Sequence, residues 1–136
     1  MHYPRKAWFD FYSDTLYYKL FSAWDVLGHL IDAQYALKVK HVDFGRAVTA
    51  LGKSQQAPNV YADLAQIASS PHFQKAKDIR NDITHNYLPN VPGLTVSNRH
   101  SPTWSLSPKR YVYANEIVEN VDHVMRLFGS TLTCLS

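Results

Sequence analysis

Large apolar residues recur at helical spacing near the start of the chain, and this pattern limits the fold more than any other feature. Five of them follow at steps of four, four, three and four between residues 13 and 39: Leu16, Leu20, Trp24, Leu27 and Ile31. Residues at such steps share one face of an α-helix. Ser13 or Asp14 is a suitable N-cap. The pattern predicts a long amphipathic helix whose apolar face must be buried against other elements.

Two shorter helices are expected next. The segment DFGRAVTALG begins at a suitable N-cap, Asp43, and ends at Gly52, a residue type favoured just past a helix end. The segment NVYADLAQIASS, residues 59–70, predicts a short extra helix.

Serine–proline pairs mark the start of two more helices, because serine is a good N-cap and proline fits the first helical position. Ser70 and Pro71 open a helix that runs to about residue 87 or 88, before the next proline. Ser107 and Pro108 open the last helix. Seven of its residues, expected to form a packing seam, alternate steps of three and four: Tyr111, Ala114, Val118, Val121, Met125, Phe128 and Leu132.

A long loop is expected over residues 88–109, which hold four prolines and show no sustained period. Loops of this length are commonly functional or mobile. Only five glycines occur in the 136 residues, few for an all-β chain full of tight turns. We therefore predict one all-α domain over residues 1–136: an antiparallel bundle of four main helices plus a short extra helix, with the Pro-rich loop before the last helix.

Composition and missing motifs exclude several classes of protein. The single cysteine, Cys134, cannot form an intrachain disulfide or a multi-cysteine zinc site. No stretch approaches the roughly 20 apolar residues that span a bilayer, and the first residues lack the apolar core of a signal peptide. The glycines form neither a P-loop nor a dinucleotide-binding pattern. We expect a soluble, cytoplasmic protein with a small positive net charge, +3, and no membrane partner.

The most informative stretch is RNDITHNY, which ends the helix that begins at Pro71. At about 100° per residue, Asn81 and His85 project within roughly 40° of each other, and Arg80 and Tyr87 within roughly 20°. Arg80 and His85 are about 140° apart, so one straight helix does not easily bring both onto one phosphate. A second copy of the helix would bring them together.

The buried arc of this helix is expected to centre on Ile83, with Ile79, Ala76 and Tyr87 beside it. Arg80 then lies at the margin of the arc. Asn81 and His85 fall on the far side, where they face solvent, a cleft or a partner.

This constellation resembles the motif of the HEPN superfamily. The family motif is an arginine, four to six residues and a histidine, commonly with a polar residue directly after the arginine; Arg80, Asn81 and His85 match it with the four-residue spacing. Tyr87 resembles the subgroup of HEPN toxins that are paired with a small nucleotidyltransferase antitoxin. The stretch LYYKLFSAWDVLGHLID is similar to the first helix of certain uncharacterised bacterial HEPN proteins, so the resemblance covers most of the chain.

The resemblance implies a metal-independent endoribonuclease that needs no cofactor and acts as a homodimer, with two motif helices meeting across a two-fold axis. His85 would transfer protons around the attack of the 2′-hydroxyl, and Arg80 would stabilise the charge on the phosphorane. Asn81 would orient either group or bind a phosphate oxygen. Tyr87 would be the position that an antitoxin partner modifies with AMP. The implied setting is a toxin–antitoxin or phage-defence system.

Basic residues elsewhere are candidates for contact with the phosphate backbone of RNA. One group runs from the end of the first predicted helix to just past the end of the second: Lys38, Lys40, Arg46 and Lys53. The others lie on the motif helix or in and beside the long loop: Lys77, Arg99, Lys109 and Arg110. Trp104 in the loop would stack on an unpaired base or anchor the loop on the bundle.

Other interpretations of the same residues stay open at this stage. Arg80 would have a purely structural role if it paired with Asp78 or Asp82 while His85 capped the helix. The chain would then be a non-catalytic HEPN dimer that binds RNA, a nucleotide or a protein, or a structural dimer with no ligand. Two helix faces that carry acidic residues and histidines suggest a metal-binding bundle: Asp25, His29 and Asp32 on the first helix, and Glu116, Glu119, Asp122 and His123 on the last. A solvated acidic face is the preferred interpretation, because the Glu-x-x-His pair of ferritin-like metal sites is absent from the sequence.

Overall fold

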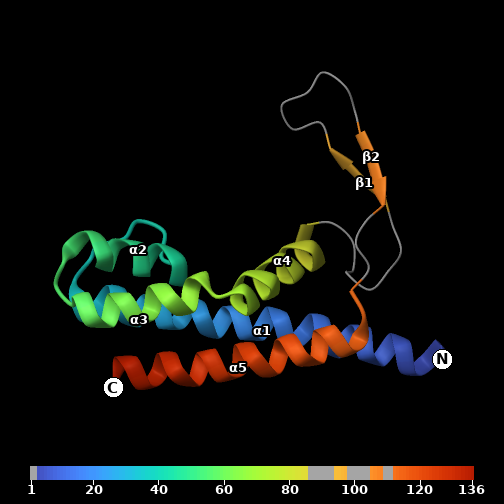
Figure 1. Ribbon diagram of the computed structural model, residues 1–136, viewed down its shortest axis with the longest axis horizontal. Coiled ribbons are helices and arrows are strands. Elements are labelled where there is room, and N and C mark those ends of the chain that lie inside the picture. The colour runs from blue at the N-terminus through green and yellow to red at the C-terminus, as the bar shows by residue number, and fades with distance from the viewer. Residues whose placement is uncertain (1–2, 86–93, 98–104, 109–111) are drawn as a thin grey trace.

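Helices dominate the computed structural model, which describes residues 3–85, 94–97, 105–108 and 112–136 (Figure 1). Its helices are α1 (Tyr3–Tyr35), α2 (Phe44–Ser54), α3 (Pro58–Ser69), α4 (Pro71–His85) and α5 (Ala114–Leu135). The predicted all-α bundle is therefore confirmed. Within the segment expected to be a loop, the strands β1 (Leu94–Ser97) and β2 (Ser105–Pro108) pair antiparallel, with Leu94 opposite Pro108.

The helices pack in two directions around α1. In Figure 1, α1 and α5 lie side by side and run the same way, whereas α3 and α4 follow each other in the opposite direction. Helix α2 packs on the C-terminal half of α1 and against α3. The hairpin stands away from the helices (Figure 1). No helix within the described ranges is long and apolar enough to cross a membrane.

Trp24 is the centre of the core. Its side chain is fully buried, and three phenylalanine rings from α2, α4 and α5 meet it edge to face. The ring centroids of Phe44, Phe73 and Phe128 lie 4.5, 4.9 and 5.3 Å from that of the indole. Such pairs add stabilising contact beyond the apolar area they bury. One residue of α1 therefore holds three other helices in place.

A polar connection inside the bundle sets the rotation of α5. The side chain of Asn120 is buried, accepts a hydrogen bond from the Tyr17 hydroxyl (2.9 Å) and donates one to the backbone oxygen of His72 (2.9 Å). Asn120 thus ties α5 to α1 and α4 at once. Because both of its partners are satisfied only when Asn120 faces inward, the bundle excludes other rotations of α5.

This rotation corrects the predicted seam of the last helix. Val121 and Phe128 of that seam pack against the core as expected, but Val118, Met125 and Leu132 were also expected to be buried and are 60%, 50% and 47% exposed. The buried side chains of α5 lie on a neighbouring face that includes two polar residues: Ile117, Asn120, Val124 and Thr131. The apolar spacing did not distinguish these two faces, because the hydrogen bonds of Asn120 are invisible in a hydrophobic pattern.

The first predicted helix also needs correction. Helix α1 begins at Tyr3, ten residues before the expected cap, and Ser13 lies inside it with its hydroxyl donating to the backbone oxygen of Phe9 (2.7 Å). Leu16 was expected on the buried face but is 41% exposed. A serine inside a helix can satisfy its hydroxyl on the preceding turn, so its presence does not force a helix to start.

Some predicted caps are confirmed and others are wrong. Asp43 accepts from the backbone N–H of Arg46 (2.8 Å), and Ser70 accepts from that of Phe73 (3.2 Å), so both cap helices as expected. Helix α2, in contrast, continues past Gly52 to Ser54 and ends at Gln55 in the left-handed region. Helix α5 begins after the cap residue Tyr113, whereas the expected cap Ser107 and the expected first helical residue Pro108 lie in β2.

Replacing Asn120 tests the polar connection between the three helices. Asn120→Ala leaves the Tyr17 hydroxyl and the His72 carbonyl without their partner, so we expect the free energy of unfolding to fall by roughly 2–4 kcal/mol. Urea unfolding followed by circular dichroism measures this. The matched control is exposed Asn115→Ala, expected to change stability by no more than about 0.5 kcal/mol. Equal effects of the two variants would contradict the role of Asn120.

Gly28 permits the close approach of α1 to the start of α2. A Cβ atom at Gly28 would lie 2.7 Å from the backbone carbon of Asp43 and 2.8 Å from the nitrogen of Phe44. Gly28→Ala should therefore destabilise the fold by about 1–3 kcal/mol. Gly129 in α5 has open space where a Cβ atom would lie, so Gly129→Ala should stabilise the fold by roughly 0.5–1 kcal/mol. Thermal unfolding distinguishes the two, and a stabilising Gly28→Ala would disprove the close contact.

Candidate functional site

Helix α4 carries the motif, and its buried face fixes where Arg80 lies. Phe73, Ala76 and Ile79 follow at steps of three and are buried against the bundle. Ile83 is half-buried against the core, as expected for the same face. Arg80 directly follows Ile79, so its stem leaves the helix at the edge of the buried face, at the margin predicted from the sequence.

The Arg80 guanidinium is held by its neighbour on the helix. One terminal nitrogen, Nη1, donates to the side-chain oxygen of Asn81 (3.2 Å), and the buried Nε has no hydrogen-bond partner among the residues that the structure describes. In the described part of the chain Arg80 makes no ion pair, so neither Asp78 nor Asp82 neutralises it. Asn81 was expected on a different stripe of the helix, but it lies beside Arg80 because its short side chain turns back toward the guanidinium.

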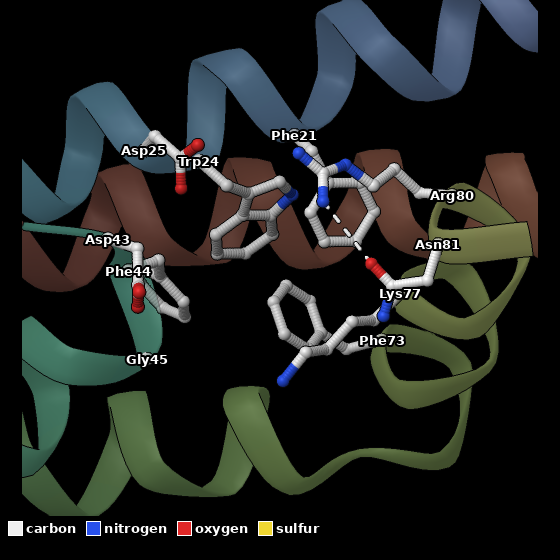
Figure 2. A pocket seen from close by; sticks show the side chains of 10 residues that line it. All are labelled: Phe21, Trp24, Asp25, Asp43, Phe44, Gly45, Phe73, Lys77, Arg80 and Asn81. Atoms are coloured by element: carbon white, nitrogen blue, oxygen red, sulfur yellow. Dashed lines mark hydrogen bonds between the residues drawn. The ribbon is translucent and has the colours of Figure 1, made fainter. Parts of the chain in front are cut away.

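Arg80 and Asn81 line a partly enclosed cavity of about 240 Å³ between α1, α2 and α4 (Figure 2). Figure 2 shows carboxylates on one side of it and the side chains of Arg80 and Asn81 on the other. Its lining comes from three short stretches: Phe21, Trp24 and Asp25; Asp43, Phe44 and Gly45; Phe73, Lys77, Arg80 and Asn81. The cavity therefore joins an aromatic floor to charges of both signs.

Asp25 supplies one of those charges in a partly desolvated setting. Burial raises the pKa of its carboxyl above the ordinary value, and the nearby Asp43 carboxylate raises it further. The backbone N–H of Phe44 donates to Asp25, and Arg80 and His29 lie close enough to favour its charged form, so these groups oppose the rise of the pKa. Asp43 is more engaged, because its carboxylate caps α2 and pairs with the Arg46 side chain (3.3 Å).

Comparison with known families decides what kind of chain carries this site. The model of the HEPN_Cthe2314-like HEPN family matches residues 1–134. This chain belongs to the HEPN superfamily. The HEPN resemblance is thereby confirmed at the level of the superfamily, whereas the roles of Arg80, Asn81 and His85 stay predictions. No curated protein and no solved structure matches this HEPN chain.

Only some of the remaining predicted site residues lie in the part of the chain that the structure describes. His85 is the last residue of α4, but its side chain lies outside what the structure describes. The other candidates for modification or RNA contact, at and after the end of α4, lie outside the described residues altogether: Tyr87, Arg99, Trp104, Lys109 and Arg110. Lys77 is exposed at the cavity.

A groove beside the cavity brings several of the predicted basic residues together. It holds about 730 Å³ and is lined by Lys40, Arg46, Lys53 and Lys77 among others. Because Lys77 lines both the groove and the cavity, the basic surface of this HEPN chain runs up to the motif helix. The fourth predicted member of the first cluster, Lys38, is exposed in the left-handed backbone region before α2.

Sequence reasoning missed the part of the site that α1 contributes. Asp25 was grouped with His29 and Asp32 as a face of one helix, yet Asp32 accepts from the backbone N–H of Val39 (2.9 Å) and supports the turn after α1. Within the described ranges no three acidic, histidine or cysteine residues gather as a metal site. The available signal was the position of Asp25 directly after Trp24, at the edge of the buried face.

The raised pKa of Asp25 predicts a pH-dependent effect of its removal. A carboxyl whose pKa is higher in the folded protein than in the unfolded chain makes the fold lose stability as pH rises through that range. Asp25→Asn lacks this loss and keeps an acceptor for the Phe44 N–H. Its free energy of unfolding, relative to wild type, should therefore increase between about pH 3 and pH 7. Urea titrations at both pH values measure it, with exposed Asp63→Asn as control; a shrinking difference would refute the effect.

Proposed function

We propose that this HEPN protein is a metal-independent endoribonuclease that acts as a homodimer. The observation that supports it best is the state of Arg80: its guanidinium is half-buried, oriented by Asn81, and paired with no carboxylate in the described residues. A structural arginine in the same place would be expected to have its charge neutralised. A guanidinium with open donors beside a cavity is suited to bind an anion such as phosphate.

The reaction would be attack of a ribose 2′-hydroxyl on the adjacent phosphorus. His85 would remove the 2′-hydroxyl proton or protonate the leaving 5′-oxygen, and Arg80 would stabilise the added negative charge on the phosphorane. Asn81 would position Arg80 through the hydrogen bond to Nη1. The products would be an RNA with a 2′,3′-cyclic phosphate end and one with a 5′-hydroxyl.

A second copy would complete the site. Arg80 and His85 lie five residues apart on α4, which places their Cα–Cβ directions about 140° apart around the helix axis. In a two-fold dimer the same surface meets itself, so Arg80 of one protomer faces His85 of the other. Each dimer would then contain two composite sites.

The basic groove would guide RNA to this composite site. Lys40, Arg46, Lys53 and Lys77 line it from α2, the preceding turn and α4. Several lysine and arginine side chains along one surface attract a phosphate backbone without reading its sequence. The toxin–antitoxin or phage-defence setting, an antitoxin partner and modification of Tyr87 belong to the same proposal and rest on the HEPN resemblance.

Cleavage of RNA by purified variants tests the proposal. In EDTA, wild type should cleave total RNA or tRNA to products with 2′,3′-cyclic phosphate ends, and Arg80→Ala and His85→Ala should each lower the rate by about 10²–10⁴-fold. Arg126→Ala is the matched control, because Arg126 is an exposed arginine of α5 that pairs with Asp122. Circular dichroism checks that every variant is folded. RNA binding without cleavage by all proteins would favour the non-catalytic HEPN alternative.

Mixing the two inactive variants tests the composite site separately. Refolded together, Arg80→Ala and His85→Ala should regain roughly a quarter of wild-type activity, because half of the dimers are mixed and each mixed dimer has one intact site. No recovery, despite mixed dimers seen by native mass spectrometry, would mean that Arg80 and His85 do not combine across a dimer.

A further inference from the structure

Two buried donors on residues that line the cavity have no acceptor in the described part of the chain. They are the indole Nε1 of Trp24 and the Nε of Arg80, both buried and without a hydrogen-bond partner among the described residues. Buried N–H groups in folded proteins are nearly always paired, so each unpaired one calls for an explanation. Figure 2 shows the indole nitrogen on the edge of its ring turned toward the Arg80 guanidinium. Two such donors on residues that line one cavity are suited to a ligand edge that carries acceptors.

The opposite side of the cavity offers acceptors. Asp43 is largely occupied by the N-terminus of α2 and the Arg46 side chain. Asp25 receives one backbone N–H, from Phe44, whereas a carboxylate has room for about four donors. Asp25 is therefore the acceptor that a ligand would use. A simple phosphate does not fit this side, because its charge would repel both carboxylates.

The size and floor of the cavity restrict the ligand further. About 240 Å³ is less than the roughly 300–1,000 Å³ of pockets that enclose whole drug-sized molecules. The apolar part of the lining is aromatic and consists of the side chains of Phe21, Trp24, Phe44 and Phe73. A small flat group with acceptors on one edge and donors on the next matches these surroundings. In a ribonuclease that group is an unstacked base.

We propose that the cavity binds a guanine base of single-stranded RNA, next to the phosphate that is cleaved. Its O6 and N7 accept from Trp24 Nε1 and Arg80 Nε, and its N1–H and N2–H₂ donate to the Asp25 carboxylate. Guanine alone among the four bases presents two adjacent donors to a carboxylate; adenine and cytosine present a ring acceptor beside their amino group, and uracil a single N–H. This inference deepens the proposed ribonuclease function and rests on it.

The arrangement gives Arg80 two contacts with the substrate. Its Nε faces the base, while the terminal nitrogens remain for the phosphate, one of them already oriented by Asn81. Lys77, exposed at the same cavity, adds a second positive charge for the nucleotide phosphate. Selection of the base and stabilisation of the charge on phosphorus would thus depend on one guanidinium.

Binding of mononucleotides to the full chain tests the pocket without any cleavage. By calorimetry in EDTA, GMP should bind roughly tenfold more tightly than IMP, which lacks the 2-amino group, and more tightly still than AMP. Asp25→Asn should weaken GMP binding by at least about tenfold and remove the preference over IMP. The control Asp122→Asn, a surface carboxylate of α5, should bind GMP as wild type does.

A spectroscopic measurement locates the bound base. In ¹H–¹⁵N spectra the indole N–H signal of Trp24, identified as the one that persists in both Trp8→Phe and Trp104→Phe, should shift on addition of GMP and much less with AMP. This readout uses wild-type protein, so it holds even where a core substitution unfolds the chain. An indole signal that does not move at saturating GMP would overturn the proposed contact.

The outcomes separate this inference from the ribonuclease proposal. Cleavage that depends on Arg80, together with equal binding of GMP and AMP, would overturn the guanine pocket and leave the ribonuclease standing. GMP binding that depends on Asp25, in a protein that cleaves no RNA, would support the pocket and refute the ribonuclease. If wild type cleaves beside guanine and Asp25→Asn cleaves beside all four bases alike, both proposals would be supported.

Discussion

The packing of three phenylalanine rings around the Trp24 indole is the interaction on which the rest of this HEPN structure depends. Trp24 lies on α1, and its partners Phe44, Phe73 and Phe128 lie on three other helices. Aromatic rings in edge-to-face contact define angles as well as distances, so the cluster fixes how those helices sit on α1. Asp25 directly follows Trp24 on α1, and Arg80 lies on the same helix as Phe73. The cluster therefore also places Asp25 and Arg80 on opposite sides of the cavity. Core packing and the geometry of the site therefore have one origin.

The helical class, the confirmed caps and the motif helix were accessible from the sequence because each depends on local chemistry. Serine before proline capped α4, and Asp43 capped α2, through hydrogen bonds that span three residues. The rotation of α5 was not accessible, because it depends on Asn120 bonding to Tyr17, 103 positions away in the chain. The pairing of β1 with β2 was also missed, since a four-residue strand leaves too short a pattern to show a period.

The candidate site also contains both kinds of residue, those that the local sequence identifies and those that only the packing of the helices brings together. Arg80, Asn81 and His85 were found because they are close together in sequence and follow a family motif. Asp25 and Trp24 were not linked to them, because their approach to Arg80 arises from the crossing of α1 and α4. Helical-wheel geometry placed Arg80 correctly at the margin of the buried face but separated Asn81 from it. The Asn81 side chain turns its amide oxygen toward the Arg80 donor. A helical wheel shows only the Cα–Cβ directions and does not represent this turn.

The hydrogen atom that Gly28 carries in place of a side chain has a consequence for ligand choice. Backbone atoms of Asp43 and Phe44 would lie within 2.9 Å of a Cβ at this position, so even one methyl group would push the start of α2 away from α1. That movement would separate the Phe44 N–H from Asp25 and widen the space between the carboxylate and the aromatic floor. The glycine at position 28 therefore limits the width of the cavity: if the cavity binds a base as proposed, related chains with a larger residue there would have a wider cavity and a different base preference, although no residue that lines the cavity had changed.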